Sequence, residues 1–477
     1  MNLLESSYSS IREHLIQNDI KCTDLVETCL AHISSHQDLN SFITVLNEHA
    51  YKKAKAVDDR LKQGKIKKLS GLIIAIKDNI CIKNVKTTCA SRILHNYISP
   101  YNATVIEKLE AEDAIILGKT NMDEFAMGSS NENSFFGNVK NPYQKDRVPG
   151  GSSGGSAVSV AANLTMAALG SDTGGSIRQP ASFCGIVGLK PTYSRVSRFG
   201  LVAFASSLDQ IGPLAKNVED CGRILEVIAG YDSHDSTCSN IPVPSYVDSL
   251  HNNPEELSVG LPVEYFSDDL APDIKDRIED VIKFLKASGV HVKEISLPHT
   301  NYAIADYYII ATAEASSNLE RYDGARYGYR NSSNSGLDEM YVNSRSQGFG
   351  DEVKRRIMLG THVLSSGYYD AYYRKAQKVR ALIKSDFDAA FTKCDCILTP
   401  TAPTSAFKIG EKVSNPLEMY LSDIYTVPAN LAGIPAVSIP VGTDANKLPI
   451  GLQLMAKPFN ESTLLNIAYF VEKNYKD

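Results

Sequence analysis

The apolar residues at the start of the chain follow a helical spacing. They recur three or four positions apart, as in the series Leu25, Cys29 and Ile33, which places them on one face of a helix. Thr23 precedes this series and is a suitable N-cap for the helix. We therefore expect residues 1–63 to form a helical N-terminal layer.

After this layer, short β-branched runs alternate with segments of helical periodicity. The runs that predict strands are 72–76, 114–117, 187–189, 257–261, 290–295, 396–398, 436–441 and 450–455. The segments that predict helices are 103–112, 155–168, 218–228, 274–287, 369–391 and 462–471. Such alternation is typical of an α/β fold. We predict a large mixed, mostly parallel central sheet that is covered by helices.

The chain shows little sign of division into separate domains. Residues 236–256 are rich in Pro, Ser and Asn, which predicts an excursion at the surface, but predicted strands continue on both sides of it. No repeat of 20 to 50 residues is visible. We expect a single domain over residues 1–477, with residues 64–215 as its catalytic core.

Composition and charge narrow the class of protein. With 43% hydrophobic and 22% charged residues, the 477-residue chain can bury a large core. The formal net charge is −6 and no run of five like charges occurs, so the chain alone offers no electrostatic surface for a nucleic-acid backbone. The most apolar segment, 157–169, is interrupted by polar residues and is too short to span a bilayer.

The cysteines and the first residues favour a reducing, cytoplasmic location. The nine cysteines are scattered without C-x-x-C spacing, and the start of the chain lacks a basic segment followed by an apolar one. Cys394 and Cys396 could be read as a metal or redox pair. We favour a strand with both thiols on one face, because no other ligands accompany them.

The first stretch with chemical content is Ile73–Asn79, in which Lys77 ends an apolar run. Taken alone, the pattern favours a solvated lysine before an Asp-Asn turn. A catalytic lysine would instead have to be desolvated, because burial lowers the pKa of the ammonium and leaves an amine that accepts protons near pH 7.

The second stretch, Val148–Ser156, contains four glycines among serines and runs directly into an Ala-rich segment. Such a sequence lets the backbone adopt positive φ and bring hydroxyl and N–H groups close to a ligand. A flexible linker is the alternative, but linkers seldom open onto an apolar helix.

The third stretch is Gly170–Arg178, in which Gly174 and Gly175 precede Ser176. A tight turn here could point successive N–H groups at one oxyanion on an acylated serine. Residues 150–155 match G-x-S-x-G, but no buried strand precedes them, and no P-loop or H-E-x-x-H pattern is present. Serine chemistry without an obvious histidine leaves a lysine as the available proton acceptor.

Together, these three stretches resemble the amidase signature family over nearly the whole chain. The resemblance rests on the sequence from Gly150 to Ser156 followed by that from Gly170 to Ala181. It implies the family's fold, with Ser176 as nucleophile, Ser152 as a bridging serine in a cis peptide and Lys77 as base. The implied oxyanion hole consists of the N–H groups of Thr173, Gly174, Gly175 and Ser176.

Three further stretches, 118–130, 313–319 and 419–426, resemble the branch of this family that hydrolyses glutamine within tRNA-dependent amidotransferases. The resemblance implies that Asp423 binds the α-ammonium group of glutamine and Arg356 its α-carboxylate, with Tyr307 and Ser129 nearby. A bidentate guanidinium suits a carboxylate. From the residues alone, Arg356 could equally be a surface charge on an amphipathic helix, and Asp423 a helix cap.

The function implied by the resemblance is hydrolysis of glutamine through a γ-glutamyl ester on Ser176. The ammonia would serve to convert Glu-tRNA(Gln) to Gln-tRNA(Gln) on a partner B subunit, with a small C subunit bracing the complex. The resemblance implies no cofactor or metal in this chain, and ATP and Mg²⁺ on the partner. Two alternatives remain: a stand-alone amidase acting on another small amide, and a non-catalytic scaffold.

Overall fold

The computed structural model describes residues 3–252, 254–266, 270–332 and 336–476. Within these ranges one mixed sheet runs through the molecule, in the order β1-β3-β2-β4-β6-β5-β10-β11-β9-β7-β8. Its strands are β1 (Phe42–Val45), β2 (Ile73–Lys77), β3 (Ile115–Thr120), β4 (Ala167–Asp172), β5 (Val187–Lys190), β6 (Gln210–Ala215), β7 (Ser258–Pro262), β8 (His291–Ile295), β9 (Cys396–Pro400), β10 (Ala436–Thr443) and β11 (Pro449–Ala456).

The helices of the described residues cover this sheet and extend beyond it on one side. They are α1 (Tyr8–Ile16), α2 (Cys22–Ser35), α3 (Asn47–Lys62), α4 (Thr104–Ala111), α5 (Gly154–Ala161), α6 (Arg178–Phe183), α7 (Val218–Ile228), α8 (Pro272–Ala287), α9 (Ala303–Asn318), α10 (Leu337–Gly348), α11 (Asp351–Leu364), α12 (Tyr373–Ala390), α13 (Pro416–Leu421), α14 (Val427–Leu431) and α15 (Glu461–Asn474). Short 3-10 turns include η3 (Arg92–Leu94) and η4 (Glu124–Ala126).

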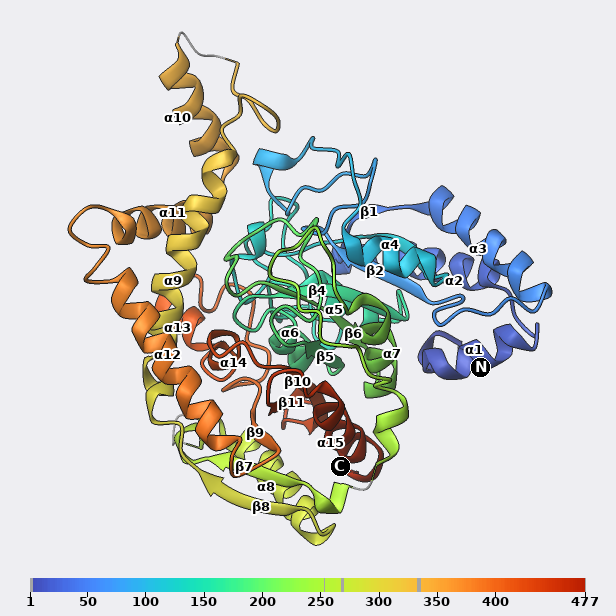
Figure 1. Cartoon of the computed structure of the whole chain (residues 1–477). Coiled ribbons are helices and arrows are strands. Elements are labelled where there is room, and N and C mark those ends of the chain that lie inside the picture. Colours follow the sequence, from blue (N-terminus) through green and yellow to red (C-terminus); the bar gives the residue numbers. More distant parts are fainter. Residues whose placement is uncertain (1–2, 253, 267–269, 333–335, 477) are drawn as a thin grey trace.

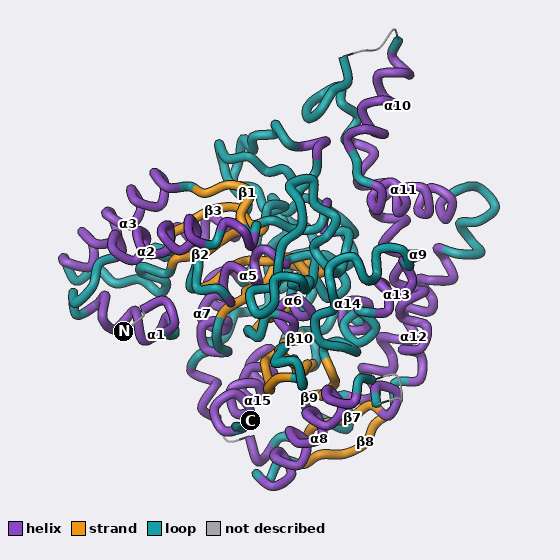
Figure 2. The backbone as a smooth tube through the Cα atoms, turned by 180° about the vertical axis from the view of Figure 1, so that it is seen from behind, coloured by secondary structure: helices purple, strands orange, loops and turns teal. Residues whose placement is uncertain are grey.

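Different sets of helices cover different parts of the sheet. Figures 1 and 2 show α1 to α3 beside the β1 end, and α9, α11 and α12 together on the opposite side, with α10 projecting from the body. Helices α5 and α6 pack against the central strands, while α7 and α15 pack against each other and against β6 and β10. Every residue of β2, β3, β4, β6 and β11 is buried, because helices cover both faces of the sheet there.

The α/β class and the mixed sheet are confirmed, but the expectation of a mostly parallel sheet is wrong. Of the ten strand pairings among the described residues, only β2 with β3, β2 with β4, β7 with β8 and β7 with β9 are parallel. The order of pairing explains the difference. A hairpin joins β10 to β11, which makes this pair antiparallel. Strand β6 lies between β4 and β5 and runs antiparallel to both, so these pairs lack the crossover connection that parallel neighbours require.

Two element predictions also need correction. The helix expected at 155–168 ends at Ala161, because Asn163 adopts a left-handed φ of 56°, and the apolar residues after it form the central strand β4. In the described part of the expected layer, residues 3–63, helices are joined by short turns and interrupted by one strand, β1, which pairs antiparallel with β3.

The cap expected of Thr23 is supplied from elsewhere. Helix α2 begins at Cys22, and the carboxylate of Asp58 on α3 accepts the backbone N–H groups of Cys22 and Thr23 at 2.7 and 3.2 Å. Asp58 therefore satisfies the free donors at this helix start from a neighbouring helix. Residues 236–256 contain no strand or α-helix among those described, yet Tyr246 is fully buried there.

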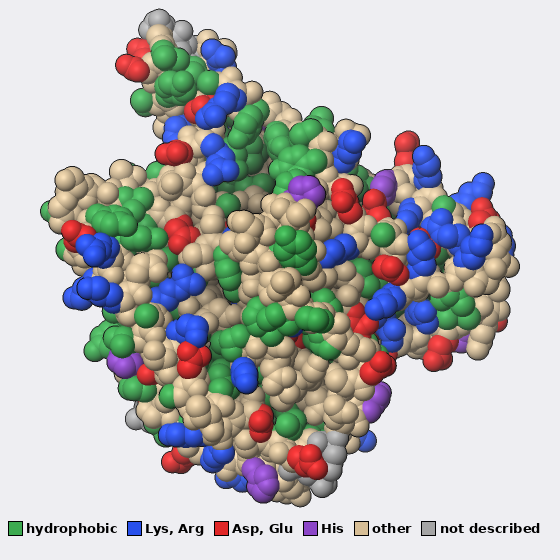
Figure 3. Space-filling view, in the orientation of Figure 1, with side chains coloured by type: hydrophobic (Ala, Val, Ile, Leu, Met, Phe, Trp, Pro, Cys, Tyr) green, Lys and Arg blue, Asp and Glu red, His purple; other side chains and the backbone are tan. Residues whose placement is uncertain are grey.

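The surface agrees with the modest net charge. Acidic and basic side chains are interspersed on the face that Figure 3 shows, and a hollow lined by apolar side chains lies between the projecting α10 and the body. None of the described helices is long and apolar enough to cross a bilayer.

Candidate active site

Lys77 lies at the end of β2 and is completely buried, so the solvated-lysine interpretation is wrong. Its Nζ donates to Ser152 Oγ at 2.7 Å, to Ser153 Oγ at 2.8 Å and to the carbonyl oxygen of Ser171 at 3.2 Å. Burial lowers the pKa of Lys77 to about 7, although nearby carboxylates oppose this shift. The amine is therefore poised to accept a proton near neutral pH.

The glycine-rich stretch is a fixed loop and not a linker. The peptide bond between Gly151 and Ser152 is cis, as the family resemblance implies. The N–H of Gly151 donates to Gln179 Oε1 at 2.9 Å, and the carbonyl oxygen of Ser152 accepts the N–H of Asp123 at 3.2 Å. Ser152 is thereby held between the end of β2 and the residues that follow β3.

Ser176 lies in the turn between β4 and α6 and is 7% exposed. Its carbonyl oxygen accepts the N–H of Ser153 at 3.2 Å, which joins the two serine-containing loops. Within the described part of the chain, the hydroxyl of Ser176 makes no hydrogen bond. The link from Lys77 to Ser152 is thus formed here, and the link from Ser152 to Ser176 is not.

The four N–H groups expected to form the oxyanion hole are not equivalent. The N–H of Gly175, whose φ is +142°, already donates to Asp172 Oδ1 at 2.9 Å. Among the described residues, the N–H groups of Thr173, Gly174 and Ser176 have no hydrogen-bond partner, so they are the donors open to an oxyanion.

A fully buried ion pair fixes this turn. Arg178 donates to both carboxylate oxygens of Asp172, at 2.9 and 3.1 Å, and also to the side chains of Asn430 and Gln453. Burial alone would raise the pKa of Asp172, but Arg178 outweighs it and lowers that pKa to about 2. Asp172 therefore stays ionised and continues to hold the N–H of Gly175.

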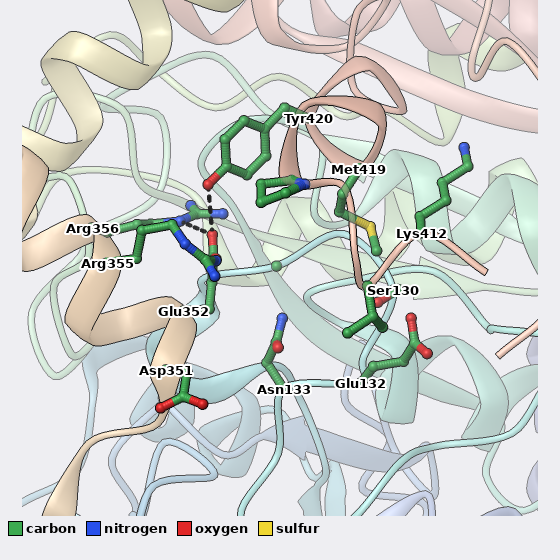
Figure 4. A pocket seen from close by; sticks show the side chains of 13 residues that line it. Ser130, Glu132, Asn133, Asp351, Glu352, Arg355, Arg356, Lys412, Met419 and Tyr420 are labelled. Atoms are coloured by element: carbon green, nitrogen blue, oxygen red, sulfur yellow. Dashed lines mark hydrogen bonds and ion pairs between the residues drawn. The ribbon is translucent and has the colours of Figure 1, made fainter. Parts of the chain in front are cut away.

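Arg356 faces inward from α11 and is 3% exposed, so the surface-charge interpretation is wrong. Its Nε donates to Glu352 Oε1 at 2.8 Å, one helical turn earlier. Its guanidinium carbon lies 5.2 Å from the ring centroid of Tyr308 and 5.6 Å from those of Phe204 and Tyr420. Glu352 also accepts a hydrogen bond of 3.0 Å from the Tyr420 hydroxyl, as Figure 4 shows.

Asp423 follows α13 and does not act as a side-chain helix cap. One of its carboxylate oxygens accepts a hydrogen bond from Ser129 Oγ, and the other, although buried, has no partner in the described structure. Burial raises the pKa of Asp423 to about 7, which the Ser129 hydrogen bond opposes. A carboxylate with one free, desolvated oxygen is suited to receive a cation.

Tyr307 joins the two halves of the site. Its ring projects from α9 and packs against the turn that carries Ser176. The two are so close that a Cβ added to Gly174 would lie 2.7 Å from the Tyr307 ring. Its burial raises the pKa of its hydroxyl well above the usual value. All of the predicted site residues therefore lie in one region, although they come from segments spread between residues 77 and 423.

A cavity of about 230 Å³ opens at the Arg356 end of this region. Figure 4 shows several of its side chains, and the lining residues are Gly128, Ser130, Glu132, Asn133, Asp351, Glu352, Arg355, Arg356, Lys412, Val413, Pro416, Met419 and Tyr420. Glu352 was not predicted from the sequence. Its spacing of four residues from Arg356 on an amphipathic helix was the available signal.

The thiols give no sign of metal or redox chemistry within the described ranges. All nine cysteines are buried free thiols. Cys394 and Cys396 are both buried and Asp395 between them is exposed, but the strand expected to carry both thiols begins at Cys396, and Cys394 lies in the turn before it. No group of three or more His, Cys, Asp or Glu residues that could hold a metal ion occurs among the described residues.

Comparison with known proteins agrees with this geometry. The amidase family matches residues 24–465. The chain belongs to the amidase family. Within the family, the A subunit of glutamyl-tRNA(Gln) amidotransferase from Desulforamulus reducens is 54% identical over 476 residues, which cover 99% of this chain and 98% of that protein. The protein of the same name from Chlorobium limicola is 55% identical over 470 residues, covering 98% and 99%.

A solved member of the family has the same architecture. The crystal structure of the A subunit of glutamyl-tRNA(Gln) amidotransferase from Thermotoga maritima is similar with a TM-score of 0.82 and 41% identity, covering 99% of this chain and 96% of that one. The amidase-signature fold expected from the sequence is thereby confirmed.

Proposed function

We propose that this chain is the glutamine-hydrolysing subunit of a glutamyl-tRNA(Gln) amidotransferase. The observation that carries the proposal is the pair formed by Arg356 and Asp423. One buried cation and one buried carboxylate with a free oxygen lie close to the Lys77–Ser152 pair and Ser176. The α-carboxylate and α-ammonium groups of glutamine complement these two charges, and its side chain can reach toward the serines.

The proposed chemistry is acyl transfer with Ser176 as nucleophile and Lys77 as base. Neutral Lys77 takes a proton from Ser152 while Ser152 takes the proton of Ser176, whose oxygen attacks the carboxamide carbon. The carbon–nitrogen bond then breaks, and the relay returns one proton so that ammonia leaves and a γ-glutamyl ester remains. Water hydrolyses the ester to glutamate.

The hydrogen bond between Ser152 and Ser176 would form with substrate bound, since catalytic contacts often tighten only in the complex. The N–H groups of Gly174 and Ser176 would stabilise the oxyanion, with Thr173 completing the set. Because the N–H of Gly175 already donates to Asp172, this N–H would stabilise the turn and would not bind the oxyanion.

We further propose that the ammonia passes to a B subunit that activates Glu-tRNA(Gln), with a C subunit in the complex. This chain would need no cofactor of its own, and ATP and Mg²⁺ would be bound by the partner. The complex would function in the cytoplasm, where the nine free thiols would stay reduced. The entire chain would act as one catalytic domain.

The decisive experiment compares substrates in an Arg356→Ala variant of the purified complex. We expect KM for glutamine to rise roughly 100-fold with kcat changed less than about threefold, because a buried cation for the α-carboxylate is lost. Turnover of butyramide, which has the same carboxamide end but no α-groups, should be unchanged. Arg374→Ala, which removes an exposed arginine of α12, is the matched control.

A stand-alone amidase for apolar amides would give the opposite result, with glutamine KM unchanged by Arg356→Ala. A non-catalytic scaffold would show no glutamine hydrolysis that depends on Ser176. Identification of the chains and tRNA that co-purify with the native protein tests the proposed partners directly.

A further inference from the structure

Glu124 is a buried carboxylate that the proposed chemistry does not use. It belongs to η4, follows β3 and is 4% exposed. One of its oxygens accepts a hydrogen bond from Ser91 Oγ, and the other accepts the backbone N–H of Gly350 at 2.8 Å. A carboxylate placed at this depth needs such partners to offset its lost hydration.

Gly350 is the residue from which α11 starts. It is the N-cap of that helix, and its own residue type provides no side-chain cap. The carboxylate of Glu124 therefore caps α11 from a segment 226 residues earlier in the chain. The accepting oxygen satisfies one of the free N–H groups at the helix start, and this contact does not require a full charge, because burial raises the pKa of Glu124 to about 7.

The contact continues on both sides of Gly350. Ser91 Oγ also lies 3.3 Å from the carbonyl oxygen of Gly348, and the ring of Phe349 packs 5.7 Å from that of Phe125. The junction between α10 and α11 is thus fixed to the residues after β3 by one polar contact, from Glu124, and one aromatic contact, from Phe125, and a second polar contact comes from Ser91, which precedes β3.

The neighbouring residue connects the same segment to the reaction centre. The N–H of Asp123 donates to the carbonyl oxygen of Ser152 at 3.2 Å, and its carboxylate accepts the N–H groups of Asn131 and Asn133 at 2.9 and 3.1 Å. Two consecutive residues therefore hold the Ser152 loop on one side and the start of α11 on the other.

We propose that Glu124 is a positioning residue for substrate binding, which sets α11, and with it Arg356, at a fixed distance from the serines. This inference rests on the proposed function, since Arg356 is the group taken to bind the α-carboxylate. Arg356 lies in the second turn of α11, so a shift of the helix start moves the guanidinium. Displacement of a binding group by about 1 Å can cost up to 100-fold in rate.

The test uses paired variants from both ends of the contact, measured in the purified complex. Glu124→Ala removes the acceptor. Glu124→Gln keeps one acceptor oxygen for the N–H of Gly350 and can donate to Ser91, so it should rescue binding. We expect Glu124→Ala to raise KM for glutamine roughly tenfold with kcat within about twofold, and Glu124→Gln to stay near the wild type.

Gly350→Pro removes the N–H without any substitution in η4. Its φ of −73° suits proline, and Phe349 before it has φ −97° and ψ 142°, which proline tolerates. Gly350→Ala adds the same Cβ, which would lie 2.5 Å from Glu124 Oε2, but keeps the N–H. The proline variant should therefore have a KM about fivefold above that of the alanine variant, and adding Glu124→Ala to it should produce little further change.

The inference is overturned if Gly350→Pro and Gly350→Ala have the same KM, or if Glu124→Ala lowers kcat and leaves KM unchanged. A purely structural role would lower the melting temperature without separating KM from kcat. If the wild-type complex hydrolyses no glutamine, the proposed function fails instead. Should Glu124→Ala not fold, the two Gly350 variants still decide the question.

Discussion

The two halves of the site are built differently. The half that carries the reaction lies among fully buried strands. Its groups come from the end of β2, the loop before α5 and the turn after β4, within residues 77–176. The half that would bind substrate lies on α9, α11 and the segment after α13, where Ser129 and Asp423 meet across 294 residues of chain. Changes in the first half should therefore act on kcat and changes in the second on KM.

The largest effect should follow from loss of the nucleophile. Ser176→Ala should reduce kcat for glutamine hydrolysis by at least about 10⁴-fold, because no other group can form the ester. Release of glutamate measures it. Ser159→Ala deletes a buried hydroxyl of α5 that donates to the carbonyl oxygen of Ser156 and accepts a hydrogen bond from Thr165, away from the three catalytic side chains, and it should leave kcat nearly unchanged. Equal losses of kcat in the two variants would show that disturbed packing, and not the loss of the ester-forming hydroxyl, lowers the activity.

Loss of the base should come next and should change the pH profile. Lys77→Ala should lower kcat by about 10² to 10⁴-fold. In the wild type the lysine is a cation below its pKa of about 7 and a neutral base above it, so kcat should rise with pH through about 7 and then level off.

Lys190→Met provides the control for that profile. Lys190 is a second buried lysine whose pKa burial lowers to about 7, but its amine donates to the carbonyl oxygen of Ile434, outside the site. If the rise in kcat survives in Lys77→Ala or disappears in Lys190→Met, Lys77 is not its source.

A different pH dependence should mark the binding half. Asp423 becomes a carboxylate only above its pKa of about 7, and only that form attracts the α-ammonium group. The apparent affinity, 1/KM, should therefore rise with pH through about 7. Asp423→Asn should raise KM roughly tenfold at pH 8 and remove this rise, while the kcat profile stays. If Asp423→Asn removed the rise of kcat with pH as well as the rise of 1/KM, the two halves would not act separately.

The smallest effect concerns the packing of α11 on α9. A Cβ on Gly360 would lie 1.9 Å from the carbonyl oxygen of Thr312, so Gly360→Ala must push the two helices apart. We expect a loss of about 1–3 kcal/mol in stability, seen as a lower melting temperature, and a KM raised about two- to fivefold at constant kcat. Gly336→Ala is the control, because the added Cβ would meet none of the described residues within 4 Å.

Much of the reacting half could be predicted from the sequence. Lys77, Ser152 and Ser176 stand in contiguous motifs whose glycines and serines mark them, and the pattern before Lys77 indicates a buried strand. The roles of Arg356 and Asp423 came only through resemblance, because a charged residue on a helix and an aspartate after one have ordinary explanations. The sequence also predicted the class of fold, since hydrophobic periodicity is a local property.

The tertiary structure alone decided which groups are paired. It paired Glu352 with Arg356, and it assigned the N–H of Gly175 to Asp172 and the N–H of Gly350 to Glu124. It ended the helix expected at 155–168 at Ala161, so that the last two residues of the prediction begin β4. It also set most strand pairings antiparallel. These outcomes depend on partners distant in the chain, and burial there decides both the pKa of a group and whether its hydrogen bonds are satisfied.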